Sequence, residues 1–155
     1  MKALISVIYA SRSTEHFQEH QIPDLLKQAR LANAKHELTG MLLYINGNFL
    51  QVLEGQPDLV EAVYGVILRD KRQTQATLIA RETIVERAYE GWTLCHKTLD
   101  PVEAGEIIGD PDYFTSGTWV TQLDALRAKK LLSAASVRWQ MEHRSGKYRT
   151  LGRTA

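Results

Sequence analysis

Apolar and polar residues follow two different periods along the first hundred positions of the chain. The alternation typical of half-buried strands occurs in five segments, at residues 3–11, 38–45, 49–55, 76–85 and 91–99. Apolar residues three and four positions apart, with a proline in the first turn, predict helices over 22–33 and 57–70. Asn46-Gly47, a strong hairpin signal, joins the second strand to the third. This order predicts an α+β fold, a ferredoxin-like β-α-β-β-α-β sandwich with one further strand, in which both helices cover one face of an antiparallel sheet.

The pattern changes after residue 98. Two Asp-Pro steps and several glycines predict a connecting loop over 100–119, and residues 120–143 show the spacing of one or two helices. We therefore expect a first domain over 1–98, followed over 99–155 by a linker, C-terminal helices and a basic, disordered tail beginning at residue 144. The helices should cover the sheet face that the first two leave open. The expected contact residues are Leu123, Leu126, Leu131, Leu132 and Trp139.

The composition is that of one ordinary globular domain. The chain has 155 residues, of which 44% are hydrophobic and 24% charged. Its apolar runs fall short of the roughly 18 residues of a membrane span, and its start reads as a strand and not as a signal peptide. A single cysteine, Cys95, excludes an internal disulfide and reads as a core thiol, and the histidines show no metal-ligand spacing. We expect a cytoplasmic protein without a metal or a membrane partner.

The net charge of +1 conceals an asymmetry near the C-terminus. From residue 126 onward there are eight basic residues and one acidic residue, Glu142. Such a segment could bind nucleic acid or an acidic partner. It is more often a solvated end, so we expect no nucleic-acid partner.

Three polar residues stand on apolar faces. Tyr9 lies on the inward face of the first strand, Asn33 extends the apolar stripe of the first helix, and Gln51 lies between Phe49 and Leu53 on one strand face. A buried amide without a partner costs roughly 1–3 kcal/mol. Singly, each has a structural explanation: a phenol with its hydroxyl at the surface, a helix C-cap, or an amide satisfied by backbone at a sheet end. Together, on neighbouring strands and the helix above them, they outline a site for a planar heteroaromatic ligand.

Five motifs in order extend this pattern over residues 2–98. They are YASR with Tyr9, AR--N----LTG over 29–40, FLQVLEG over 49–55, D-R at Asp70 and Arg72, and I--R-Y--W over 84–92. They resemble the BLUF family, blue-light sensors that bind flavin on a ferredoxin-like domain. The resemblance implies a flavin cofactor, FAD first, with FMN or riboflavin as alternatives. The cofactor-binding residues that it implies are Tyr9, Asn33, Gln51, Asp70 and Arg72.

The resemblance also implies a role for each residue. Gln51 would lie between the Tyr9 hydroxyl and the flavin ring near its N5 and C4 carbonyl, Asn33 would hold the pyrimidine edge, and Arg72, with Asp70 nearby, would address the C2 carbonyl. Under blue light Tyr9 would pass an electron and then a proton to the flavin. After recombination, Gln51 would be left rotated or tautomerised, with a stronger hydrogen bond to the C4 carbonyl and a small red shift. A glutamine suits this role because it has both a donor and an acceptor end.

Two positions depart from the family pattern. Trp92 and Leu94 stand where the family links a Trp-Met pair to signal transmission, so the methionine is replaced, and Gln73 replaces a frequent histidine. We expect photochemistry to survive and signal transmission or dark recovery to change. No Gly-rich phosphate loop is present. Phosphate contacts would need basic residues near the first helix, namely Arg30, Lys27 and Lys35.

The segment after residue 98 shows no catalytic output domain, which resembles the short BLUF proteins that signal by binding other proteins. We expect a non-enzymatic homo-oligomer with an unknown protein effector. Two alternatives remain open. An enzyme of the acylphosphatase kind would use Arg12 and Asn33 but needs an anion loop, and no Gly-rich loop surrounds Arg12. A ligand- or protein-interaction module could have kept the fold and lost the flavin.

Overall fold

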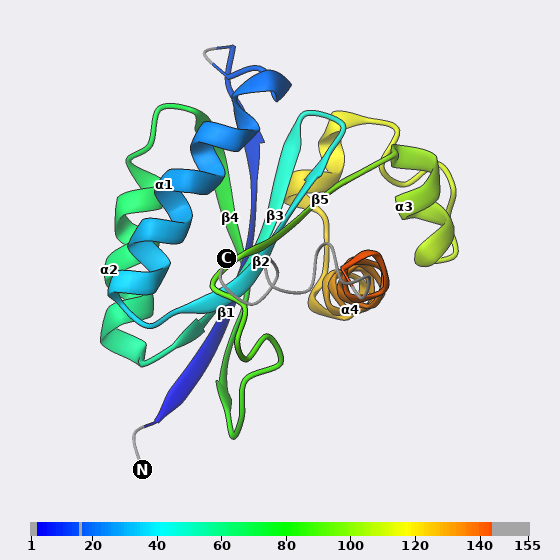
Figure 1. The fold of residues 1–155 in the computed structure, drawn as a ribbon. Coiled ribbons are helices and arrows are strands. Elements are labelled where there is room, and N and C mark those ends of the chain that lie inside the picture. Colours follow the sequence, from blue (N-terminus) through cyan, green and yellow to red (C-terminus); the bar gives the residue numbers. More distant parts are fainter. Residues whose placement is uncertain (1–2, 16, 144–155) are drawn as a thin grey trace.

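The secondary structure of the computed structural model, which describes residues 3–15 and 17–143, follows the predicted order (Figure 1). The strands are β1 (Leu4–Ser13), β2 (Thr39–Ile45), β3 (Asn48–Gly55), β4 (Gln73–Ile84) and β5 (Cys95–Leu99). The α-helices are α1 (Ile22–Lys35), α2 (Pro57–Leu68), α3 (Pro101–Ile107) and α4 (Ala125–Glu142), and the short 3-10 helices are η1 (Glu19–Gln21) and η2 (Gly117–Thr121). The predicted fold class, α+β with a C-terminal helical extension, is confirmed.

The five strands form one sheet in the order β4-β1-β3-β2-β5. β1 runs antiparallel to β3 and β4, β2 is antiparallel to β3, and the added strand β5 is parallel to β2. The β2–β3 hairpin turns at Asn46 and Gly47, whose φ angles of 48° and 76° are those that a tight hairpin turn requires. The β1–β3 register pairs Tyr9 with Gln51. Two of the three unusual polar residues are therefore direct neighbours.

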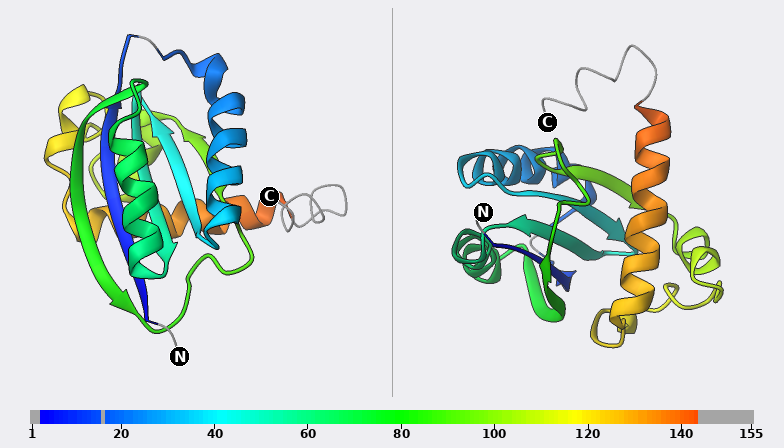
Figure 2. Two further views of the ribbon diagram at one scale, coloured as in Figure 1. Left: turned by 90° about the vertical axis from the view of Figure 1, so that its left-hand side faces the viewer. Right: turned by 90° about the horizontal axis from the view of Figure 1, so that it is seen from below.

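Helices cover both faces of the sheet (Figures 1 and 2). α1 and α2 lie side by side on one face, where Val7 and Leu53 pack with Val60 of α2. α4 crosses the other face, where Leu50 of β3 belongs to a core that includes residues of α4. This is the predicted layering. Within the part of the chain that the structure describes, no helix is both long enough and apolar enough to cross a membrane.

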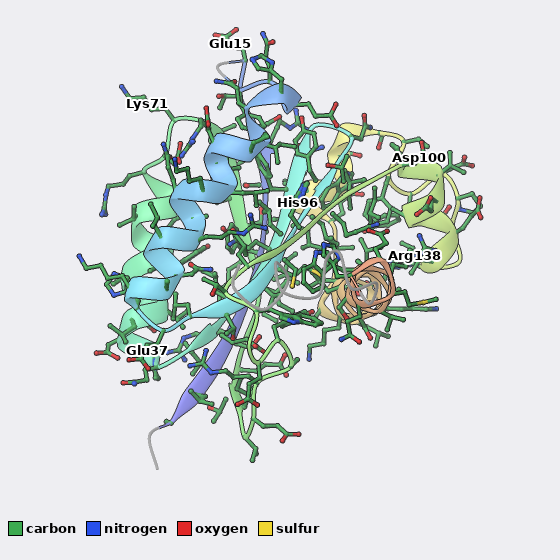
Figure 3. All side chains as sticks on the ribbon, in the orientation of Figure 1. Glu15, Glu37, Lys71, His96, Asp100 and Arg138 are labelled. Atoms are coloured by element: carbon green, nitrogen blue, oxygen red, sulfur yellow. The ribbon has the colours of Figure 1, made fainter. Side chains whose placement is uncertain are left out.

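The predicted loop over 100–119 was wrong, because it contains α3 and the start of η2. The Asp100 carboxylate accepts hydrogen bonds from the backbone nitrogens of Val102 and Glu103, which caps α3 at its first turn (Figure 3 labels Asp100). An Asp-Pro step serves equally as a turn and as a capped helix start, since aspartate suits the N-cap and proline the first helical position. We predicted the turn, and the structure shows the capped helix start.

Two further expectations about the C-terminal part need correction. The last strand begins at Cys95, so residues 91–94 approach the sheet without pairing as a strand. Leu126 does not contact the sheet, since it is 80% exposed on the outer side of α4. The other four expected contact residues are buried in the core between α4 and the sheet: Leu123, Leu131, Leu132 and Trp139. The tail predicted to be disordered, 144–155, lies outside the described residues.

Candidate functional site

A cavity of about 280 Å³ lies between α1 and α2 over the sheet. Its size is close to the lower limit of small-molecule pockets, about 300 Å³. Small side chains line it on both helices, among them Ala29 and Ala32 on α1 and Ala62 on α2. All five residues predicted to bind a cofactor are in its lining: Tyr9, Asn33, Gln51, Asp70 and Arg72. The fold therefore brings together in one cavity five residues that are spread over positions 9 to 72 of the chain.

The floor of the cavity carries a buried phenol-amide pair. Tyr9 is 1% and Gln51 5% exposed, and the Tyr9 hydroxyl donates a hydrogen bond to Gln51 Oε1. Burial raises the pKa of Tyr9 well above its usual range, and the neighbouring Tyr64 and Asp70 raise it further. The phenol is therefore protonated at physiological pH. Because Oε1 is engaged, Nε2 is the end of Gln51 that can donate to a ligand.

Asn33 connects the cavity to the segment that precedes β5. Its side chain is buried, and Nδ2 donates to the backbone oxygen of Thr93 at 2.9 Å. The helix-cap explanation of this asparagine does not hold for its side chain. The C-cap residue of α1 is His36, whose backbone nitrogen donates to the carbonyls of Ala32 and Ala34. Within the described residues, Oδ1 and the second amide proton of Asn33 have no hydrogen-bond partner, so both are available to a ligand.

Asp70 and Arg72 form an ion pair at the edge of the cavity. Arg72 Nη2 is 2.6 Å from Asp70 Oδ2, and Nε donates to both carboxylate oxygens. The hydrogen bond from Arg72 lowers the pKa of Asp70, and the carboxylate raises the pKa of Arg72 in return. Nη2 also donates to Gln28 of α1 at 3.0 Å. The guanidinium is thus held in place from two elements, and its charge is compensated locally.

Gln73 is tied at both ends of its amide. Oε1 accepts from the Ser11 hydroxyl of β1, and Nε2 donates to the Ile67 carbonyl near the end of α2. The Gln73 side chain lines the cavity, but its amide oxygen and nitrogen both form hydrogen bonds within the protein.

Gln28 and His36 also line the cavity, and neither was predicted from the sequence. Both lie four positions from Ala32, and this spacing places all three on one side of the helix axis. The helical spacing from Ala32 could therefore have indicated both residues. They were overlooked because neither one interrupts an apolar stripe.

Trp92 and Leu94 lie on opposite sides of the sheet. Leu94 is fully buried on the α1 side in a cluster with Leu42 and Phe49. The Trp92 ring packs on the other side, with its centroid 4.7 Å from that of Trp139 in α4. The three residues 92–94 thus reach both the cavity side and the α4 side.

The basic residues considered for phosphate binding lie outside the cavity lining. Arg30 Nε donates to the Leu94 carbonyl at 3.1 Å, and burial lowers the pKa of this guanidinium. Lys27 and Lys35 are exposed on α1. Cys95 is buried, and burial raises the pKa of its thiol, as expected of a core cysteine.

A ferredoxin-like sheet with a cavity between two helices, mostly apolar but with a few polar groups, is typical of a small-molecule-binding domain. Comparisons with known proteins identify which one. The model of the BLUF family, described as sensors of blue-light using FAD, matches residues 4–95. The chain belongs to the BLUF family. It therefore carries a flavin-using blue-light sensor domain.

Relatives and solved structures agree with this assignment. The chain is 34% identical over 98 residues to the photoactivated adenylate cyclase subunit beta-like protein FB of Euglena gracilis, covering 63% of this chain and 11% of that one. It is 29% identical to a bacterial light-regulated adenylyl cyclase, with a TM-score of 0.57 over 61% of this chain and 27% of that one. The BLUF protein BlrB in its dark state shares the fold, with a TM-score of 0.66 at 24% identity over 88% and 98% of the two chains. The chain spans about a tenth of the length of the first curated relatives.

Proposed function

We propose that the hydrogen bond between Tyr9 and Gln51 is the photochemical switch of this sensor. The observation that carries the proposal is a buried, hydrogen-bonded phenol-amide pair in the floor of the cavity. A bound flavin supplies blue-light absorption and, once excited, takes up an electron. Tyr9 is the oxidisable group in the lining, and it is positioned by strand pairing with Gln51.

The side chains around the cavity suit a flavin ring. The isoalloxazine has an apolar benzenoid end and a polar edge with two carbonyls and one N–H group. Small apolar residues of α1 and α2 match the first, and the amides of Asn33 and Gln51 with the guanidinium of Arg72 match the second. Asn33 and Arg72 would hold the polar edge, with Asp70 fixing Arg72.

The protein's part in the switch follows from the protonation state of Tyr9. A phenol that loses an electron becomes strongly acidic, so its proton can leave along the existing hydrogen bond to Gln51 Oε1. When the electron and proton return, a rotated or tautomerised Gln51 presents a different group to the cavity. Burial keeps each arrangement well defined, because water does not compete for the amide. A stronger hydrogen bond to the ligand's carbonyl would produce the small red shift.

The charges around the cavity affect which flavin, FAD, FMN or riboflavin, binds best. The positive charge of Arg72 is compensated by Asp70, and the other basic candidates, Arg30, Lys27 and Lys35, lie outside the lining. Phosphate groups would then add little to affinity. We infer that FAD, FMN and riboflavin bind within about tenfold of one another, since tenfold corresponds to about 1.4 kcal/mol.

The output is proposed to be non-enzymatic. Residues 1–98 would act as the sensor and 99–155 as the element that signals to a protein effector, with the chain working as a homo-oligomer in the cytoplasm. α4 supports this division, because it packs on the sheet face opposite the cavity through Trp139, which touches Trp92. A light-induced shift in population at residues 92–94 would reach α4 through that contact.

A visible absorption spectrum of the purified protein, in the dark and after blue light, tests the proposed function. We expect a yellow protein with a small, reversible red shift. A colourless protein that also does not bind added flavin would instead support the alternative function, a ligand- or protein-interaction module that has lost the flavin. A yellow protein without the shift would leave cofactor binding intact and remove the switch.

A further inference from the structure

A buried carboxylate at the end of β3 takes no part in the cavity. Glu54 is 2% exposed and lies on the α4 side of the sheet, the side to which Leu50 and Val52 of the same strand also point. Its carboxylate accepts three hydrogen bonds. The donors are the backbone nitrogen of Ala88 at 2.8 Å, that of Tyr89 at 3.0 Å and the Thr39 hydroxyl at 3.0 Å.

Among the described residues, no cation forms an ion pair with this carboxylate. The nearby Arg87 directs Nη1 to the Thr39 hydroxyl at 3.0 Å and to the backbone carbonyl of Glu54 at 3.1 Å. Burying a charge is costly unless hydrogen bonds compensate it. An aliphatic residue, like those at positions 50 and 52, would avoid that cost. The carboxylate therefore matters for the groups that it holds, and two of the three belong to one turn of the connection between β4 and β5.

That connection includes Trp92, which contacts α4, and Thr93, whose carbonyl is bonded from the cavity side. Trp92 follows directly from the held turn, since its backbone nitrogen donates to the Tyr89 carbonyl at 3.0 Å. The Tyr89 and Trp92 ring centroids are 6.4 Å apart, and Trp92 in turn contacts Trp139. Asn33 binds the next carbonyl, that of Thr93, from the cavity side. The connection is thus fastened from the cavity by α1 and from β3 by Glu54.

We propose that Glu54 is a positioning residue of the sensor, whose carboxylate fixes the turn at Ala88 and Tyr89 and so sets the contact of Trp92 with α4. The proposal rests on the proposed function. Gln51 and Glu54 lie three positions apart on β3 and point to opposite faces of the sheet. A displacement of β3 that accompanies rearrangement of Gln51 is carried to the turn by charge-assisted hydrogen bonds, which are short and directional.

The test is backbone hydrogen exchange of the full chain, measured by NMR in the dark and under blue light. Glu54→Gln keeps the size of the side chain but replaces one acceptor oxygen with an NH2 group. Ala88 bonds one carboxylate oxygen, and Tyr89 and Thr39 bond the other, so at least one of the three donors loses its acceptor. We expect whichever of the Ala88 and Tyr89 amides loses its acceptor to exchange about tenfold faster in the dark, since a lost hydrogen bond is worth about one factor of ten. Amides of β1 and β3 should stay within about twofold of wild type. Glu61→Gln, which removes an exposed carboxylate paired with Arg81, is the matched control and should change neither set.

Under blue light, Glu54→Gln should keep the flavin red shift but lose the light-induced change in exchange of the α4 amides. Unchanged protection of Ala88 and Tyr89 would overturn the proposal. A uniform acceleration across all strands would also overturn it, because Glu54 would then act only on global stability. If the glutamine variant does not fold, Glu54→Asp keeps the charge but withdraws it by one methylene, and the same local loss is expected. A chain without flavin or without a red shift would refute the proposed function, while the dark exchange would still report on Glu54.

Discussion

The two faces of the sheet are covered in different ways, and the difference shows where function resides. Under α4 the core is closely packed, with Phe114, Trp119 and Leu131 fully buried. Under α1 and α2 the packing stops short and leaves a cavity, and the polar groups Tyr9 and Gln51 are buried in its wall. Protein interiors are normally packed to crystal density, so a cavity lined by hydrogen-bonding groups indicates a ligand. One sheet thus combines a closely packed face with a face that carries a cavity.

Replacing the phenol should abolish the function of the cavity face. Tyr9→Phe is expected to bind flavin and to lose the red shift completely, because the electron and proton donor is gone. The light-minus-dark difference spectrum measures this. Tyr64→Phe is the matched control, since the Tyr64 ring lies 5.0 Å from that of Tyr9 but lines no part of the cavity, and it should keep the shift. A normal shift in Tyr9→Phe would end the proposed role of this tyrosine.

Removing the switchable amide should have the same effect. Gln51→Leu fills the same place without a donor or an acceptor, so we expect flavin binding and no red shift in the same difference spectrum. Gln28→Leu removes another amide from the lining, one that bonds Arg72 and not Tyr9, and should retain the shift. If both leucine variants shift normally, the red shift arises elsewhere in the cavity.

The α4 face should respond in stability instead of spectrum. Trp139→Ala removes a buried ring that packs on Trp92 and is expected to lower the free energy of unfolding by about 3–5 kcal/mol. Urea denaturation measures the change, and the dark absorption spectrum of the native variant should match wild type. Leu126→Ala, on the exposed side of the same helix, should stay within about 0.5 kcal/mol. Equal losses in both variants would contradict the packing described for α4.

His96 on β5 should give the protein a smaller, pH-dependent instability (Figure 3). Burial, with the charges of Arg30 and Lys97, lowers the pKa of His96 from 6.5 to about 4. Between those values the unfolded chain binds a proton that the folded chain does not, so stability is lost as pH falls from about 6.5 to 4. Allowing for solvent screening at this half-buried site, we expect a loss of about 2 kcal/mol.

The measurement is the difference between wild type and His96→Asn in urea unfolding at several pH values. Carboxylates such as Asp70 add their own acid dependence to both proteins, and the difference removes that contribution. The variant should lose less stability than wild type over this range. Parallel pH profiles would mean that His96 titrates normally in the folded protein.

The sequence predicted most of the elements because their signals are local. A period of two or of about 3.6 residues marks strands and helices, and Asn46-Gly47 marks the hairpin. Local signals failed where they are ambiguous. Asp100-Pro101 fits a turn or a capped helix, and the leucines of α4 fit more than one helical phase, which is why Leu126 was placed on the wrong side.

The sequence by itself determined that Tyr9, Asn33 and Gln51 are polar residues on apolar faces, because side-chain direction follows from the strand or helix period alone. Only the tertiary structure decided their partners. Strand pairing joins Tyr9 to Gln51 across 42 positions, and Arg30 bonds the Leu94 carbonyl 64 positions away. The physical reason is that a hydrogen bond depends on distance and angle in space. For groups far apart in sequence, these are set only when the sheet and its helices pack.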